Sequence, residues 1–174
     1  MEIFSKILVI IIGLFIFWPY FLYILIGIGL IVAIAYTPKY YRYRKIVGFG
    51  GRLLGRINHF RRKKGLIPLG RVRLLDIVTS GHSKSMARRG RCDHQSFGKR
   101  CVLIANKTGI TYIGENCYKF PAKKYDKYVA KKLVAGWLRS PGHRANIINP
   151  DFKRTGIGIR VRKGYVYACQ IFIA

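Results

Sequence analysis

Thirty consecutive residues without a charged side chain, residues 7–36, restrict the environments in which this chain can be stable. At about 1.5 Å of rise per residue, roughly twenty apolar residues are enough for a helix to cross the hydrocarbon core of a bilayer. Backbone N–H and C=O groups must be paired within such a segment, so the run is expected to be helical. The sequence therefore predicts a transmembrane anchor over residues 1–37 and a single-pass membrane protein.

A cleaved signal peptide is the alternative interpretation of this run. Ala33-Ile34-Ala35 resembles a small-x-small cleavage site, but the apolar core of a signal peptide is typically only about 7–15 residues long. The orientation of an anchor is a separate question. Lys6 precedes the run, whereas four basic residues follow it closely, and the positive-inside rule would therefore place the body of the chain in the cytoplasm. The cysteines discussed below favour the opposite side.

The charge balance indicates the kind of partner to expect. The chain has 33 Lys and Arg residues against six Asp and Glu, a formal net charge of +27, which favours membrane head groups, acidic polymers or nucleic acid. Residues 39–73 hold twelve of the basic residues and no acid. A basic juxtamembrane linker over residues 38–52 is predicted to contact anionic lipid, with a flexible joint at Gly48, Gly50 and Gly51. A nucleic-acid binder in the cytoplasm is the alternative, although no recognised nucleic-acid motif accompanies the basic residues.

Hydrophobic periodicity predicts helices in the rest of the chain. Apolar residues at helical spacing indicate one helix that begins near Leu53 and a second that ends at Gly90. A third helix is predicted between an N-cap at Asp126 and a break at Ser140. Residues 91–108 are predicted to form a long loop.

Strands are predicted in two places. Residues 110–120 are expected to form a strand, and residues 157–173 a hairpin with its turn at Lys163-Gly164. Helices and strands in this order predict an α+β fold in which helices cover a sheet.

Six short motifs follow one another between about residue 53 and the C-terminus. They are Ile57-Asn58-His59-Phe60-Arg61 with the following Gly65-Leu66-Ile67-Pro68, His82-Ser83 with Met86-Ala87, Asp93-His94 with Phe97, Gly114-Glu115-Asn116, the stretch from Trp137 to Ile147, and Gly156-Ile157-Gly158 with Gln170-Ile171-Phe172. In this order they resemble the CAP family (cysteine-rich secretory proteins, antigen 5 and pathogenesis-related proteins), also called the SCP domain, in its prokaryotic-type branch. The resemblance covers a domain over residues 53–174.

The resemblance implies a three-layer α-β-α sandwich with a cleft where His94, His143 and Glu115 converge. Neutral imidazole is a common zinc ligand, so these three residues are candidates for holding zinc or another divalent metal. A hydrogen-bonded cluster that ties loops to the sheet is the structural alternative. Four further residues are expected to support the cleft: His82, Asn116, Ser140 and Asn146. Many eukaryotic members have an acidic residue where this chain has Ser140, which weakens the case for chemistry with two acids.

Glu115 is the candidate catalytic residue if the cleft is an active site, because a metal with a carboxylate base suits hydrolysis. No nucleophile paired with a base is evident in the sequence. CAP proteins have been proposed to bind lipids or sterols and sometimes to act as hydrolases, without one common reaction. A binding module for anionic lipid, another amphiphile or an envelope polymer is therefore favoured over a metal-assisted hydrolase.

Four cysteines, all in the second half of the chain, bear on the side of the membrane. Cys92, Cys101, Cys117 and Cys169 show no Cys-x-x-Cys spacing, which makes a zinc ribbon improbable, and they allow three pairings. The pairs Cys92–Cys101 and Cys117–Cys169 are the hypothesis, the second of which requires the two strands to be neighbours. Disulfides would favour an extracytoplasmic domain, whereas four free thiols would suit a cytoplasmic one.

Overall fold

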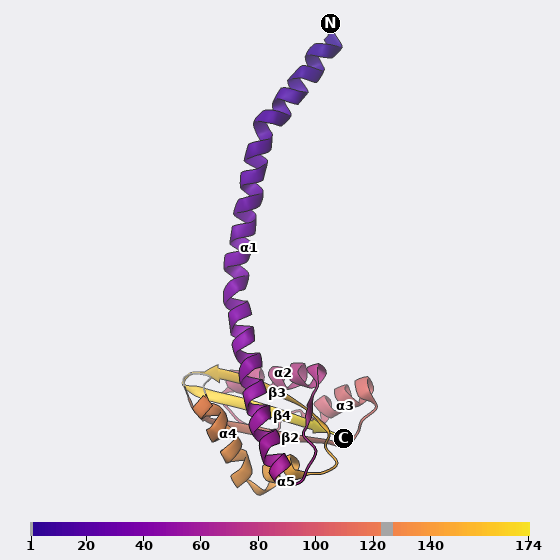
Figure 1. Ribbon diagram of the computed structural model, residues 1–174, viewed down its shortest axis with the longest axis vertical. Coiled ribbons are helices and arrows are strands. Elements are labelled where there is room, and N and C mark those ends of the chain that lie inside the picture. The colour runs from indigo at the N-terminus through magenta and orange to yellow at the C-terminus, as the bar shows by residue number, and fades with distance from the viewer. Residues whose placement is uncertain (1, 123–126) are drawn as a thin grey trace. The chain divides into compact units, whose positions relative to one another are not determined.

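Residues 2–122 and 127–174 are described by the computed structural model of the protein (Figure 1). The chain divides into two units, Met1–Arg44 and Lys45–Ala174, and helix α1 (Glu2–Lys63) contributes to both. The predicted N-cap at Asp126 lies outside the described residues.

The first unit is helical, as the uncharged run predicts. One stretch of α1, Tyr20–Pro38, is 19 residues long and apolar enough to cross a membrane, and none of it is buried inside the protein. This exposure distinguishes it from the core helix of a soluble domain, whose apolar side chains are mostly covered. One apolar helix near the N-terminus is thus present, and its length and composition fit an anchor and a signal sequence alike.

The second unit contains the end of α1 without the predicted joint. Gly50 lies within the helix, where an added Cβ would meet the Arg71 guanidinium at 2.9 Å, and Phe49 beside it is fully buried. The prediction of a flexible joint at Gly48, Gly50 and Gly51 is therefore wrong. Tertiary packing of this turn outweighs the low helix propensity of glycine.

The sheet of the second unit has the strand order β1-β3-β4-β2 among the described residues. Strand β4 (Tyr165–Ile173) lies in the middle and pairs antiparallel with β3 (Arg154–Arg162) and with β2 (Ile113–Pro121). The short β1 (Gly70–Arg71) pairs parallel with β3. The predicted hairpin is confirmed, because β3 and β4 are joined at Lys163 and Gly164.

The turn of this hairpin follows from its two residues. Lys163 and Gly164 have φ of 46° and 74°, the pair of positive values that a two-residue type I′ hairpin turn requires. Glycine adopts this conformation without cost, and lysine at the first position carries the strain.

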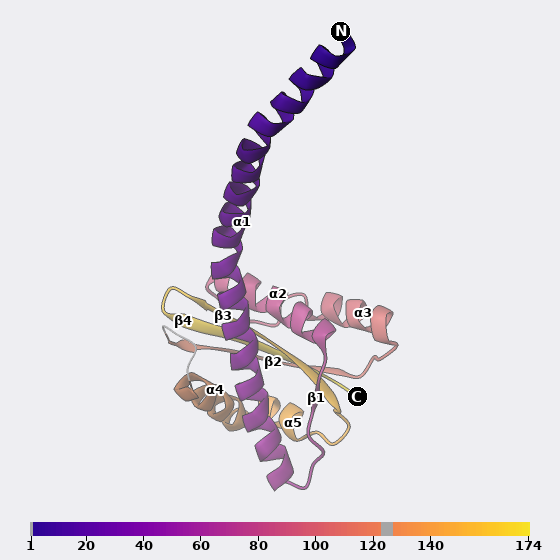
Figure 2. The same ribbon diagram turned by 45° about the horizontal axis from the view of Figure 1, so that its top comes forward.

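Helices cover both faces of the sheet (Figure 2). Helices α2 (Arg73–Arg89) and α3 (Phe97–Thr108) lie on one face, and the end of α1 with α4 (Lys127–Arg139) and α5 (Pro141–Ile148) on the other. The predicted α+β three-layer α-β-α sandwich is confirmed. The long loop predicted for residues 91–108 is wrong, since most of it forms α3.

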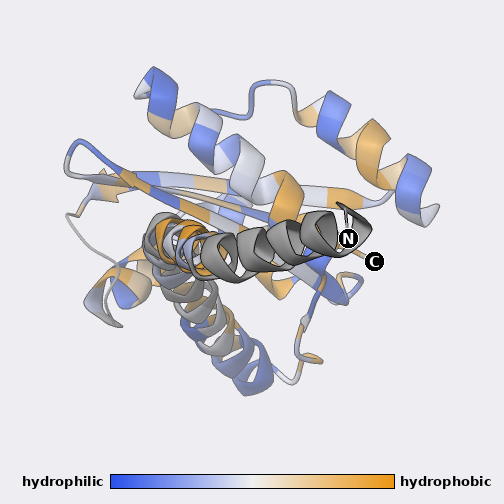
Figure 3. Cartoon of the chain, turned by 90° about the horizontal axis from the view of Figure 1, so that it is seen from above, coloured by the Kyte–Doolittle hydropathy of each residue, from blue (hydrophilic) through white to orange (hydrophobic). Residues whose placement is uncertain are grey.

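Helix α3 was hard to predict because of its composition. Basic or amide residues flank an apolar middle (Figure 3), yet of the apolar residues there only Ile104 is fully buried. Val102 and Leu103 are exposed, at 60% and 47%. The Gly, Asn, Asp and Cys residues of the stretch 91–108 favoured a loop and concealed this helix.

The second unit has two hydrophobic cores, one on each face of the sheet, and the side chains of β4 point alternately into them. Val166, Ala168 and Phe172 face the core under α1 and α4, whereas Cys169 and Ile171 face the core under α2. Successive side chains of a strand point to opposite faces, so one strand supplies both layers.

Candidate functional site

The site is built around Glu115, a buried carboxylate on β2 whose side chain is 1% exposed. It faces α2 and α3, like Cys117 two residues later on the same strand. Arg100 of α3 donates two hydrogen bonds to it, from Nε to Oε2 at 2.8 Å and from Nη2 to Oε1 at 2.7 Å. This bidentate geometry compensates the cost of burying a carboxylate.

Arg100 also reaches His82, which lies on α2. Its Nη1 donates to His82 Nδ1 at 3.1 Å and to the Gln95 carbonyl at 2.8 Å. A guanidinium can only donate, so His82 Nδ1 is the acceptor. The other ring nitrogen, Nε2, therefore carries the proton and donates to the Asp93 carbonyl at 2.8 Å. The predicted supporting role of His82 takes this form: it joins α2 to the loop before α3.

Two thiols complete the buried side of the cluster. Cys117 Sγ lies 3.6 Å from Glu115 Oε1, and Cys169 Sγ lies 3.5 Å from Oε2. A hydrogen bond from Cys169 and the nearby His82 lower the pKa of Cys117 to about 7, against the effect of burial. Burial and the neighbouring Cys117 raise the pKa of Cys169 well above its ordinary value.

The predicted disulfides are absent, and all four cysteines are free thiols. Cys117 and Cys169 are direct partners across β2 and β4, so the strands are neighbours as the hypothesis required. Both thiols contact the Glu115 carboxylate and do not form a disulfide with each other. Cys92 is exposed. Cys101 lies in α3 and not in a loop, so the helix, and not a disulfide, determines where its side chain points. Free thiols give no support to an extracytoplasmic domain.

The open side of the cluster holds the two histidines of the predicted cleft. His94 Nδ1 lies 2.9 Å from Glu115 Oε1, and the His94 side chain is 51% exposed. His143 on α5 faces His94, with 6.4 Å between the ring centroids. Burial and then the nearby His94 lower the pKa of His143, whose buried Nδ1 has no hydrogen-bond partner among the described residues. The structure thus brings His94, His143 and Glu115 together.

Two asparagines fasten α5 to β2 beneath this pair. Asn116 Nδ2 donates to the His143 carbonyl at 3.0 Å, and Asn146 Nδ2 donates to Asn116 Oδ1 at 2.8 Å. Ser140 occupies the N-cap position of α5, where its carbonyl accepts the Arg144 N–H at 2.8 Å. The Ser140 hydroxyl makes no capping hydrogen bond, so its contribution is made through the backbone.

Within the predicted metal set of His94, His143 and Glu115, protein donors already occupy the Glu115 carboxylate. Both carboxylate oxygens already accept hydrogen bonds from Arg100, and His94 adds a contact to one of them. The His, Cys, Asp and Glu side chains whose ligand atoms do converge among the described residues are His82, Glu115 and Cys117, within 4.8 Å of one another.

Arg100, Cys117 and Cys169 are the members of the cluster that sequence reasoning did not place at the site. One signal was available for Cys117, because residues i and i+2 of a strand share a face. Arg100 gave none, since it lies in the stretch that was predicted to be a loop.

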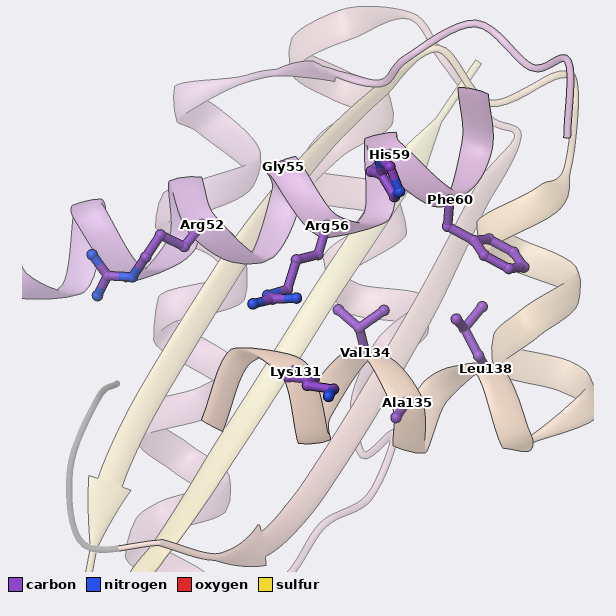
Figure 4. A pocket seen from close by; sticks show the side chains of 9 residues that line it. All are labelled: Arg52, Gly55, Arg56, His59, Phe60, Lys131, Val134, Ala135 and Leu138. Carbon is purple, nitrogen blue, oxygen red and sulfur yellow. The ribbon is translucent and has the colours of Figure 1, made fainter. Parts of the chain in front are cut away.

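A second concave site lies between α1 and α4, with a volume of about 520 Å³ (Figure 4). Its apolar wall combines one aromatic and three aliphatic residues: Phe60, Val134, Ala135 and Leu138. Polar and basic residues complete the lining: Arg52, Arg56, His59 and Lys131, together with Gly55. Spacing along the sequence does not reveal this pocket, because it depends on which helices pack side by side.

Comparison with known proteins gives consistent matches for the second unit. The family model described as "CAP: Cysteine-rich secretory protein family" matches residues 54–172. The uncharacterised protein YkwD of Bacillus subtilis (strain 168) is 32% identical over 117 residues, which cover 65% of this chain and 42% of that protein.

Solved structures show the same fold. An extracellular protein from Bacillus anthracis str. Ames that contains an SCP domain has a TM-score of 0.56 and 31% identity, over 72% of this chain and 40% of its own. An outer surface protein from Borrelia burgdorferi has a TM-score of 0.55 at 19% identity, over 70% of this chain and 88% of its own, a likeness of fold alone. The chain thus spans about two fifths of the length of the two Bacillus relatives.

Proposed function

Because the chain belongs to the cysteine-rich secretory protein (CAP) family, we propose that it is a binding module that holds an anionic amphiphile in the pocket between α1 and α4. The proposed ligand is a lipid with a long acyl chain and a negatively charged head group. The helix Tyr20–Pro38 would tether the module to a bilayer, where such lipids are found.

The observation that carries this proposal is the composition of the pocket. Phe60, Val134 and Leu138 offer an apolar wall, and Arg56 and Lys131 stand at its edge (Figure 4). Among the described residues, no ion pair joins Arg56 or Lys131 to an acid, so both charges remain available to an anionic head group. A volume of about 520 Å³ lies within the usual range of small-molecule sites.

We place the domain on the extracytoplasmic side. The Bacillus anthracis relative is described as an extracellular protein, and it shares 31% identity with this chain. The basic residues that follow the apolar run favour the cytoplasm by the positive-inside rule, which is a bias and not a strict rule. On the outer side the same residues would meet anionic lipid or an anionic envelope polymer.

The arrangement around Glu115 favours a metal-assisted hydrolase less than a binding module. Glu115 would have to act as a metal ligand or as a free base, and both its oxygens are held by Arg100. Among the described residues, no serine, threonine or cysteine is hydrogen-bonded to His94. The cleft is therefore assigned a structural or ligand-contacting role.

Ligand binding can be tested with the full chain in nanodiscs of zwitterionic lipid and an environment-sensitive fluorescent fatty acid, with empty nanodiscs as the blank. Ala135→Phe fills the pocket and Arg56→Ser removes a charge from its edge. We expect each to weaken binding by roughly tenfold, a loss of about 1.4 kcal/mol. Arg62→Ser removes an exposed charge from the same helix outside the pocket and should leave the affinity unchanged.

A fatty alcohol of the same chain length separates the two halves of the proposal. On the wild-type protein, the alcohol should displace the fluorescent fatty acid less well than an unlabelled fatty acid does. On the Arg56→Ser variant, the alcohol and the acid should displace it equally well. If Ala135→Phe binds the acid as tightly as the wild type does, the pocket is not the binding site.

A further inference from the structure

We propose that Arg100 is the resident cation of the cleft: its guanidinium occupies the place at Glu115 that a divalent metal ion would take, and the cleft keeps its structure without a metal. The proposal concerns the cluster around Glu115 and is independent of the lipid pocket. Of the residues predicted to bind metal, it concerns Glu115.

The first step is the need of Glu115 for a positive charge. Its side chain is 1% exposed, and an isolated carboxylate is too costly to bury. Arg100 meets this need with two hydrogen bonds of 2.7 and 2.8 Å, and its own side chain is 11% exposed. A guanidinium is charged at every accessible pH, so this cation does not leave by losing a proton.

The second step is that a metal would need the lone pairs that Arg100 already uses. His82, Glu115 and Cys117 offer a nitrogen, an oxygen and a sulfur atom within 4.8 Å of one another, a set that suits zinc at about 2.0–2.3 Å from each ligand. Arg100 Nη1 donates to His82 Nδ1 at 3.1 Å, and Arg100 Nε and Nη2 each take one lone pair of a Glu115 oxygen. The other sides of these oxygens face His94 Nδ1 at 2.9 Å and Cys169 Sγ at 3.5 Å. Two of the three ligands are therefore unavailable to a metal while the guanidinium is in place.

The third step is that Arg100 is held firmly where it is. Its Nη1 donates a further hydrogen bond to the Gln95 carbonyl at 2.8 Å, and its guanidinium carbon lies 5.8 Å from the centroid of the Phe97 ring. The contacts thus come from α2, from β2 and from the loop that leads into α3. A metal ion would have to displace all of them to reach Glu115.

The test is metal binding by the full chain, purified in detergent with a non-chelating reductant. Cobalt(II) is the probe for the sulfur ligand, because a cobalt–thiolate bond gives a charge-transfer absorption band, and equilibrium dialysis measures zinc(II). The wild-type protein should show no such band. Its zinc binding should be the same as that of the Glu115→Gln variant. Arg100→Ala should gain the band and bind zinc at least about tenfold more tightly, and Arg100→Ala with Cys117→Ser should lose the band again.

Two comparisons keep the result specific. Arg91→Ala removes an exposed positive charge that makes no side-chain contact with Glu115, and it should bind both metals as the wild type does. If the wild-type protein binds one zinc ion and Glu115→Gln removes that ion, Arg100 does not hold the place of a metal and the proposal is overturned. This comparison does not require Arg100→Ala to fold. A folded Arg100→Ala variant, judged by circular dichroism, that gains neither the band nor zinc affinity overturns it as well.

Discussion

Arg61 is a fully buried cation near the end of α1, paired with carbonyl oxygens instead of an acid. Its guanidinium donates four hydrogen bonds of 2.8–3.0 Å to the carbonyls of Ile67, Ile147, Asn149 and Phe152. Burial lowers its pKa, yet a guanidinium stays charged. One side chain thus joins the end of α1, the end of α5 and the segment before β3.

Replacement of Arg61 should therefore be costly. Arg61→Met leaves four carbonyl groups without their donor, those of Ile147 and Phe152 in buried hydrogen bonds, and we expect the free energy of unfolding to fall by about 3 kcal/mol or more. Denaturation followed by circular dichroism measures the loss. Arg62→Met, at the exposed neighbouring position, should change stability by no more than about 0.5 kcal/mol. Equal stability of the two variants would show that the buried hydrogen bonds contribute little.

The contact between α2 and the sheet depends on two glycines of β3. A Cβ added at Gly156 would collide with Leu75 and the backbone of Asp76, and one added at Gly158 with the backbone of Thr79 and Ser80. These glycines let the helix lie directly on the strand. Close packing in turn brings Ser83 of α2 within 2.7 Å of the Gly158 carbonyl, to which its hydroxyl donates a hydrogen bond.

Gly158→Ala should push α2 off the sheet and lower the free energy of unfolding by about 3 kcal/mol, because the clash is with backbone that cannot rotate away. Gly81→Ala is the matched substitution within α2. Its added Cβ meets nothing within 4 Å, so it should raise stability by about 0.5–1 kcal/mol through the higher helix propensity of alanine. Thermal unfolding of both variants gives the comparison, and a neutral Gly158→Ala would mean that α2 can shift at little cost.

At the scale of the whole molecule, the side of the membrane decides which partners the +27 charge can meet. We expect protease added to intact cells to cleave the second unit, because the domain is proposed to lie outside. Complete protection in intact cells, together with cleavage after lysis, would place the domain in the cytoplasm.

In that second case nucleic acid becomes a real competitor for the basic residues. A direct competition between anionic vesicles and DNA for the purified full chain distinguishes the two partners, because salt weakens both interactions. We expect the chain to bind the vesicles in preference to DNA at physiological salt.

The apolar helix, the β3–β4 hairpin and the layered α+β fold could be predicted from the sequence, because each rests on a local pattern. A charge-free run, alternation along a strand and the turn residues Lys163 and Gly164 are all read within about thirty residues or fewer. The order of the motifs, through the family that they resemble, predicted that His94, Glu115 and His143 lie close together.

Three features depended on contacts between segments far apart in the chain. The pairing of Arg100 with Glu115 required α3, which the Gly, Asn, Asp and Cys residues of this stretch had indicated to be a loop. The pocket between α1 and α4 exists only because those helices pack side by side on one face of the sheet. The thiols of Cys117 and Cys169 stay free because they face a buried carboxylate, and spacing along a sequence carries no information about such an environment.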